Sequence, residues 1–311
     1  MATTITLGNS IGFAQAFMGW KALNIGANNE PAITSGNIIM QTILAPPFSW
    51  NWNRGSATIN ATAGNQDYST AASSFGFIEK ASYAIPPATI TNTALTAGVA
   101  TYTASNTFQT GDLVTVTGTS NGAGIYNITN QAVVSATGSQ FTVLINSGNV
   151  ASGSDSGTAV VGTTTEISQV MNILGSGTEM GSPNMIAPQV DDNAGNITFR
   201  VLPIPNRSYT ITVIFQKRIP ALMTTTSSTW APIPDHYSYI YQWGFLALMQ
   251  AYNYDTRWVQ SSQKFVSGLL GAAEGLSEEQ KNIFQGAWLN TLTEQQYRSQ
   301  EATQGINARQ T

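Results

Sequence analysis

The chain of 311 residues has no cysteine, one histidine and few charged side chains. Without cysteine, it cannot form disulfides, thiolate nucleophiles or cysteine-ligated zinc sites. Charged residues make up 9% of the sequence, far below the roughly one quarter that is usual in soluble domains. Asn, Gln, Ser, Thr and Gly must therefore solvate most of the surface, a composition typical of β-rich proteins and of surfaces covered by other subunits.

Basic clusters, leader sequences and membrane spans are also missing from the sequence. The net charge is −4 and no cluster of Lys and Arg occurs, so strong sequence-independent DNA binding is not expected. The first residues lack the basic segment and continuous apolar run of a signal peptide, so we do not expect secretion by the usual route. No apolar run is long enough for a convincing membrane helix.

The residues that catalysis would need are scarce. His236 follows Asp235 at a predicted helix start, where capping or packing explains it better than catalysis. No G-x-S-x-G elbow, phosphate-binding loop or G-x-G-x-x-G follows a predicted strand. The pair Asp191 and Asp192 lacks EF-hand spacing, so we interpret it as an acidic turn rather than a calcium site. We predict no enzyme activity, no catalytic or metal-binding residues and no cofactor.

A long apolar helix beginning near Tyr237 dominates the C-terminal part, residues 230–292. Asp235 is its predicted N-cap. Apolar residues surround the whole helix, which predicts burial on all sides, in a core or between subunits. The side chains assigned to this core or assembly helix are Tyr237, Ile240, Tyr241, Trp243, Phe245 and Leu248. Two interpretations stay open: a helical core within one chain, or burial of this helix by other copies.

Further helices are predicted on both sides of the β region. An amphipathic helix begins near Trp258 and runs to about Glu274, and Ser277 opens a capping box for another helix. The N-terminal segment, residues 1–47, contains an extended arm and two short helices, the second ended by Pro46 and Pro47. We expect the helices of both chain ends to pack in one bundle.

Between these ends, the pattern predicts antiparallel strands. Phe48–Arg54 alternates as a strand should, and a longer strand is expected from Glu166 to Leu174. The clearest strands are Ile197–Leu202 and Tyr209–Phe215, joined as a hairpin. The host β domain thus comprises residues 48–87 and 164–229.

Residues 88–163 have a different composition. They contain no Lys or Arg and two acids, Asp112 and Asp155. Short strand-like runs alternate with turns, one of them at Ser152-Gly153-Ser154, which predicts a small all-β module. We favour an insertion into the host domain over one continuous β domain.

The last segment, residues 293–311, loses the apolar pattern and should be disordered when alone. Tyr297 and Ile306 are its apolar anchors, and Arg298 and Arg309 add charge. We expect this tail to become ordered against a partner.

Four segments of the host domain together resemble a known family. They are Gly76-Phe77-Ile78-Glu79-Lys80-Ala81, Ile197 to Pro205, Tyr209 to Gln216, and Trp230 to Asp235 followed by Gly244-Phe245-Leu246-Ala247. Over roughly residues 8–86 and 164–290 the chain resembles the head-to-tail adaptor proteins of short-tailed phages (the tail tubular protein A type). The module at 88–163 departs from the minimal pattern and resembles immunoglobulin-like modules of phage tail proteins.

The resemblance implies an α+β structural virion protein. It implies a ring, usually of twelve copies, that is assembled in the host cytoplasm and joins the portal protein to the tail nozzle protein in the virion neck. DNA would pass through its channel without sequence-specific binding, and no membrane is involved. The tail residues Tyr297, Arg298, Ile306 and Arg309 would contact the portal.

Two other functions remain open from the sequence. One is a phage fibre or adhesin that binds a receptor or glycan through the 88–163 module. The other is a tail-borne glycan hydrolase. Assembly distinguishes them, because a connector should form rings or bind a portal, whereas an enzyme should turn over substrate as a monomer or small oligomer.

Overall fold

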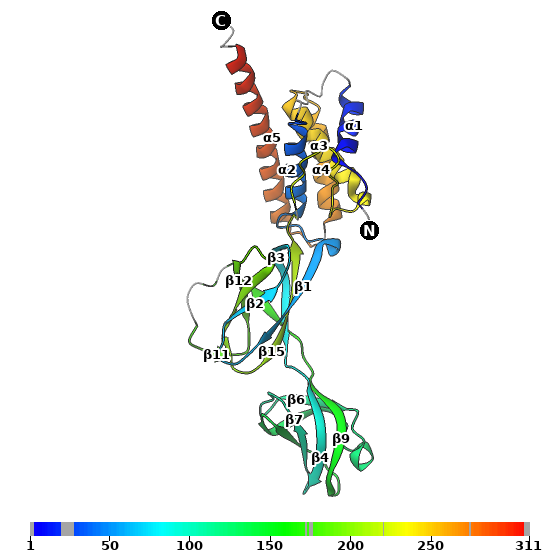
Figure 1. Cartoon of the computed structure of the whole chain (residues 1–311), viewed down its shortest axis with the longest axis vertical. Helices are drawn as coiled ribbons and strands as arrows, with labels where there is room; N and C mark the ends of the chain where they lie inside the picture. The colour runs from blue at the N-terminus through cyan, green and yellow to red at the C-terminus, as the bar shows by residue number, and fades with distance from the viewer. Residues whose placement is uncertain are drawn as a thin grey trace. The chain divides into compact units, whose positions relative to one another are not determined.

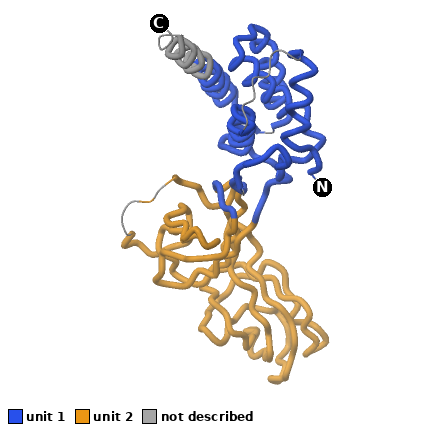
Figure 2. The backbone as a smooth tube through the Cα atoms, turned by 45° about the horizontal axis from the view of Figure 1, so that its top comes forward, with its two compact units in different colours: residues 1–55, 74–77, 216–311 blue, residues 56–73, 78–215 orange. Residues whose placement is uncertain are grey.

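The computed structural model describes residues 3–19, 28–171, 173, 177–219, 221–273 and 275–307, and for 294–307 it describes the helical backbone alone. The chain divides into two compact units. Unit 1 comprises residues 1–55, 74–77 and 216–311, and unit 2 comprises residues 56–73 and 78–215 (Figure 2). Unit 1 is mainly helical and unit 2 is built from strands.

Helices from both chain ends form unit 1 (Figure 1). They are α1 (Leu7–Met18), α2 (Ala32–Leu44), α3 (Ser238–Tyr252), α4 (Trp258–Ala272) and α5 (Glu278–Asn307). Helix α3 contacts each of the other four. Residues of α1 and α2 belong to the same hydrophobic core as residues of α3, α4 and α5, so segments more than 200 residues apart in sequence stabilise one another.

The predicted N-cap role of Asp235 is wrong. A short 3-10 helix, η3 (Asp235–Tyr237), precedes α3, and neither helix has a side-chain cap. Instead, the Asp235 carboxylate accepts hydrogen bonds from the Thr4 amide, the Thr4 hydroxyl and the Ile5 amide. These hydrogen bonds lower the pKa of Asp235. The carboxylate therefore holds the N-terminal arm against the start of α3, a long-range pairing that local sequence does not reveal.

The main sheet of unit 2 has seven strands in the order β1-β15-β3-β10-β12-β13-β2. Their bounds are β1 (Arg54–Ala61), β2 (Asp67–Ala71), β3 (Phe75–Ala84), β10 (Thr165–Gln169), β12 (Met185–Asp191), β13 (Asn196–Leu202) and β15 (Tyr209–Lys217). A two-stranded sheet pairs β11 (Met180–Gly181) with β14 (Ile204–Pro205). The Thr70 hydroxyl donates to the Thr58 carbonyl, so the edge strands β1 and β2 approach each other.

The sheet is mixed rather than antiparallel throughout. Strands β10 and β12 pair in parallel, as do β11 and β14. A parallel pair needs a long crossover connection, and residues 170–184 supply it between β10 and β12. The strand predicted over Glu166–Leu174 is correspondingly shorter, because β10 ends at Gln169.

Residues 88–161 form a closed six-stranded barrel in the order β4-β5-β8-β7-β6-β9. Its strands are β4 (Ala88–Thr96), β5 (Val99–Ala104), β6 (Leu113–Thr117), β7 (Ile128–Thr137), β8 (Gln140–Leu144) and β9 (Val150–Val161). A short 3-10 helix, η2 (Asn121–Gly124), lies between β6 and β7. The resemblance to immunoglobulin-like modules did not predict this closed barrel, whereas the prediction of a small all-β module is correct.

The barrel closes because β9 pairs with both β4 and β6. The predicted turn at Ser152-Gly153-Ser154 lies inside β9. A Cβ atom on Gly157 would lie 2.8 Å from the carbonyl oxygen of Thr117, a distance that side chains do not tolerate. Gly157 therefore allows β9 to approach β6 closely, and closure of the barrel removes the exposed strand edges.

Two other sequence predictions are corrected by the structure. Phe48–Arg54 is not a strand: η1 (Asn51–Asn53) is a 3-10 helix, and Phe48 and Trp50 belong to the core of unit 1. The C-terminal segment was predicted to be disordered when alone. The structure instead continues α5 through this segment as far as Asn307. Glu, Gln, Arg and Ala favour a helix, and the packed turns before Thr293 remove the cost of nucleation. The capping box is confirmed by reciprocal hydrogen bonds between Ser277 and Gln280.

Candidate assembly surfaces

The residues predicted for the apolar helix lie mainly in the core of unit 1. Ile240, Tyr241, Phe245 and Leu248 are at most 2% exposed, whereas Tyr237 and Trp243 are partly buried. Burial raises the pKa of Tyr241, which keeps the phenol neutral. The helices of the same chain thus account for the burial of these four side chains, and the surfaces available to other proteins must be found elsewhere.

Trp230 joins the two chain ends. Its indole stacks on Tyr241 with ring centroids 4.4 Å apart, and its Nε1 donates to the Ser10 hydroxyl of α1 at 3.0 Å. Both Trp230 and Ser10 are completely buried. This contact fixes α1 against α3 and thereby sets which residues of α1 remain at the surface.

An aromatic cluster lies at the surface where α1, α3 and α4 meet, and we call it the aromatic face. The Phe17 ring centroid is 4.8 Å from that of Phe13 and 5.1 Å from that of Trp243. The ammonium group of Lys264 sits 3.9 Å above the Trp243 ring. Phe17 is 46% exposed and Tyr239, one turn before Trp243, is 49% exposed. The Phe13/Phe17 spacing of four residues was the sequence signal for this cluster.

The side of α5 that faces away from the core, the α5 outer face, is also poor in charge. Its residues include Glu279, Ile283, Gly286, Ala287 and Leu289, all exposed. Ile283 is 64% exposed and Leu289 is 49% exposed. No charged residue occurs from Asn282 to Thr293. The opposite side of α5 is anchored by Trp288 and Leu292, which are at most 2% exposed.

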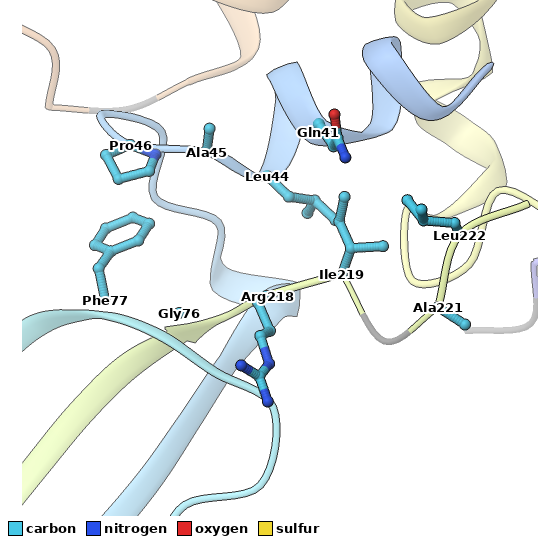
Figure 3. Close-up of a pocket in the computed structure, with 10 residues that line it drawn as sticks. All are labelled: Gln41, Leu44, Ala45, Pro46, Gly76, Phe77, Arg218, Ile219, Ala221 and Leu222. Carbon is cyan, nitrogen blue, oxygen red and sulfur yellow. The ribbon is translucent and has the colours of Figure 1, made fainter. Parts of the chain in front are cut away.

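A third surface feature of unit 1 is an apolar pocket of about 550 Å³ (Figure 3). It is lined by the end of α2, the start of β3 and the segment after β15, including Leu44, Phe77 and Leu222. At its strand side, a Cβ on Gly76 would lie 2.7 Å from the carbonyl oxygen of Gln216. Glycine is thus required there for the approach of β3 to β15.

In unit 2, a polar cleft of about 430 Å³ is lined by residues of the barrel and of the main sheet. At this cleft, the Arg207 guanidinium forms an ion pair with Asp112, and the two side chains are 12% and 14% exposed. Asp112 is one of the two acids of the barrel segment. Its carboxylate also accepts from the Gln109 amide, so it stabilises a barrel loop and contacts the 203–208 segment that connects β13 to β15. These two strands are not neighbours in the sheet, so the predicted hairpin between them is wrong.

The remaining sequence candidates have local structural roles. The His236 ring lies 4.1 Å from the Tyr237 ring. The Asp192 carboxylate accepts hydrogen bonds from Ala194 and Asn196, which lower its pKa, as expected for an acidic turn. Across the part of the chain that the structure describes, no three acidic or histidine side chains group as metal ligands would.

The predicted portal-contacting residues fall at the end of the chain. Tyr297, Arg298 and Ile306 lie on the helical backbone of α5, and Arg309 lies outside the described residues. Their role remains a prediction. Among the described helices, none combines the length and hydropathy that crossing a bilayer demands.

Comparison with known proteins identifies the class. Residues 48–287 match the SU10 adaptor protein family; the match covers all of unit 2 and, in unit 1, includes α3 and α4 but not α1, α2 or most of α5. No curated protein matches the chain.

The protein is therefore a phage adaptor, a structural protein of the virion that joins other virion components. It belongs to the SU10 adaptor protein family.

Proposed function

We propose that this adaptor forms a ring of twelve copies in the virion neck, between the portal protein and the tail nozzle protein. The family match over residues 48–287 carries the proposal, because an adaptor must contact at least two other components. The absence of charge along α1 and along α5 from Asn282 to Thr293 supports it, since a free protein is normally kept in solution by surface charge. The ring would assemble in the host cytoplasm as the virion matures.

The C-terminal segment is our candidate for the portal contact. Helix α5 spans 30 residues, and at 1.5 Å per residue it is about 45 Å long. Its last part carries Tyr297, Arg298 and Ile306, followed by Arg309. An aromatic, an apolar and two guanidinium groups are the side chains that protein interfaces favour.

The net charge of −4 per copy bears on the channel. A ring of such copies is acidic as a whole and should repel the DNA phosphates rather than bind them. DNA would therefore slide through without sequence-specific contacts, which suits a conduit.

The test is to mix the purified protein with the portal protein of the same phage and to measure particle mass and negative-stain images. We expect rings on the portal, or rings that form only when the portal is present. A variant that ends at Thr293 lacks the last part of α5; it should keep the thermal unfolding transition of the rest of the chain but lose portal binding. A stable monomer that ignores the portal would contradict the proposal.

A further inference from the structure

We propose that neighbouring copies of this chain contact each other through helices, the aromatic face of one copy packing on the α5 outer face of the next. This inference rests on the proposed ring and names the surfaces that would form it. The two faces lie on opposite sides of unit 1, because α1 and α5 flank the bundle with α3 between them (Figure 1). A head-to-tail contact in a ring requires two different surfaces on opposite sides of each subunit.

The helix stretches that make up most of both faces carry no charge of their own; the charges at the faces are Lys264 and Arg257 beside the aromatic cluster and Glu279 in the first turn of α5. No charged residue occurs in α1, from Leu7 to Met18, or in α5 from Asn282 to Thr293. A helix surface that stays in water usually presents charged residues opposite its apolar stripe. Here Phe17 and Tyr239 on one side, and Ile283 and Leu289 on the other, remain about half exposed or more.

Glycines on both helices point to close approach from outside the chain. Gly12 lies within α1 and Gly286 within α5, and a Cβ on either would meet no atom within 4 Å. A glycine inside a helix costs about 1 kcal/mol relative to alanine, and no contact within the described chain explains this cost. Exposed Ala16 and Ala287 lie beside them. Small residues let two helix backbones approach closely, so that large neighbouring side chains can interlock.

The charges next to the two faces are complementary. Lys264 lies on the aromatic face above Trp243, and Glu279 lies in the first turn of α5. Glu279 precedes Ile283 by four residues, which is about 6 Å along a helix. If Ile283 packs beside Trp243, Glu279 comes within reach of Lys264. A second copy of this chain therefore supplies both the apolar residue and the counter-charge.

The size of the faces predicts a weak pairwise contact. Helix α1 has 12 residues, so its face is about 18 Å long and about 10 Å wide. Such a face buries on the order of 200 Å² per copy, well below the roughly 800 Å² per partner of a stable complex. Two isolated copies should dissociate readily, and a closed ring, in which each copy makes two contacts, should be much more stable.

Disulfide trapping tests the contact, because the chain has no cysteine of its own. The variant with both Ala16→Cys and Ala287→Cys places one thiol on each face at exposed positions. On mild oxidation of a concentrated sample, we expect a ladder of covalent dimers, trimers and larger species. Each single variant should stop at low yields of dimer. The matched control combines Ala16→Cys with Val134→Cys on the barrel, which is 45% exposed, and should give no ladder.

A charge reversal provides a second measurement. Lys264→Glu in the Ala16→Cys, Ala287→Cys background should reduce the yield of the ladder several-fold at low salt, and adding Glu279→Lys should restore it. The double-cysteine variant could give no more ladder than the barrel control while the unmodified protein still forms rings. That result would overturn the proposed helix contact but leave the proposed ring intact. If neither ladder nor ring forms, with or without the portal, the proposed function fails as well.

Discussion

The barrel and parts of the helical unit, namely α1 and residues 282–293 of α5, have almost no charge, but the two regions differ in how these uncharged surfaces are covered. The barrel is built from one continuous stretch and closes on itself, so its strand edges are paired. Both of its acids are paired: Asp155 accepts from Ser120, Ser156 and Thr93 within the barrel, and Asp112 pairs with Arg207 of the segment between β13 and β15. The helical unit is assembled from both chain ends and leaves uncharged helix faces open. A self-contained fold needs no partner, whereas the open faces of unit 1 indicate one.

Removal of the barrel should produce the largest effect. Ala88 at its start pairs with Ala159 near its end, and Tyr83 pairs with Thr165 in the main sheet. Replacing residues 86–162 by Asn-Gly would join Ile85 to Thr163 as a two-residue hairpin. We expect the helical unit to melt at an unchanged temperature in calorimetry, with the barrel transition absent. Loss of the helical signal in far-ultraviolet circular dichroism would show that the two regions depend on each other.

A matched pair of core substitutions should separate the two regions. Trp230 is buried between α1 and α3, and Phe141 in the barrel stacks on Tyr102 at 4.7 Å. Replacing either residue by alanine should lower the free energy of unfolding of its own region by about 3–5 kcal/mol, because apolar side-chain atoms are no longer buried and a cavity remains. Trp230→Ala should lower only the helical transition and Phe141→Ala only the barrel transition. A shift of both transitions by either variant would contradict this independence.

Alanine substitutions at two glycines of unit 1 should change its stability in opposite directions. A Cβ on Gly244 in α3 would lie 2.7 Å from the Phe265 ring and 2.8 Å from Ile39, so Gly244→Ala should destabilise the bundle by about 1–3 kcal/mol. Gly286 has open space around it. Gly286→Ala should therefore stabilise the monomer by about 1 kcal/mol through helix propensity. Urea unfolding of both variants measures the difference, and equal effects would disprove the assigned packing.

The smallest effect is expected at the N-terminal arm. Because hydrogen bonds from Thr4 and Ile5 lower the pKa of Asp235 below its usual 3.8, its stabilisation is present above that pH and is lost as the pH falls further. Asp235→Asn should speed amide hydrogen exchange at Thr4 and Ile5 at neutral pH. The unmodified protein should show the same increase only in acid. An equal exchange rate in the variant and the unmodified protein at neutral pH would contradict this role.

The two units also differ in how well sequence predicts them. Regular apolar spacing indicated the helices of both chain ends, and the Ser277 capping box was correct. Alternation indicated β13 and β15, and composition indicated the all-β segment. The failures share one cause, which is contact between residues far apart in sequence. Phe48 and Trp50 look like strand residues but pack in the helical core, and the turn predicted at Ser152-Gly153-Ser154 lies inside β9, where it pairs with β4.

The assembly surfaces were predictable only in part. Trp243 was assigned to the apolar helix, but nothing in its local sequence indicates that it reaches the surface beside Phe17 and Lys264. The sequence predicted the helix that carries Ile283 and Leu289, but not which of its sides is buried. Which of its apolar residues face inward depends on the direction from which α3 and α4 pack against it.

The sequence by itself determined the composition class, the existence of the main helices and strands, and the resemblance to phage adaptors, because these depend on local periodicity and on residue type. The tertiary structure decided which side of each helix is buried, that the β module closes as a barrel, and that Asp235 holds the N-terminal arm. Each of these depends on segments brought together from distant parts of the chain, and the free energy of such contacts is not encoded in any single segment.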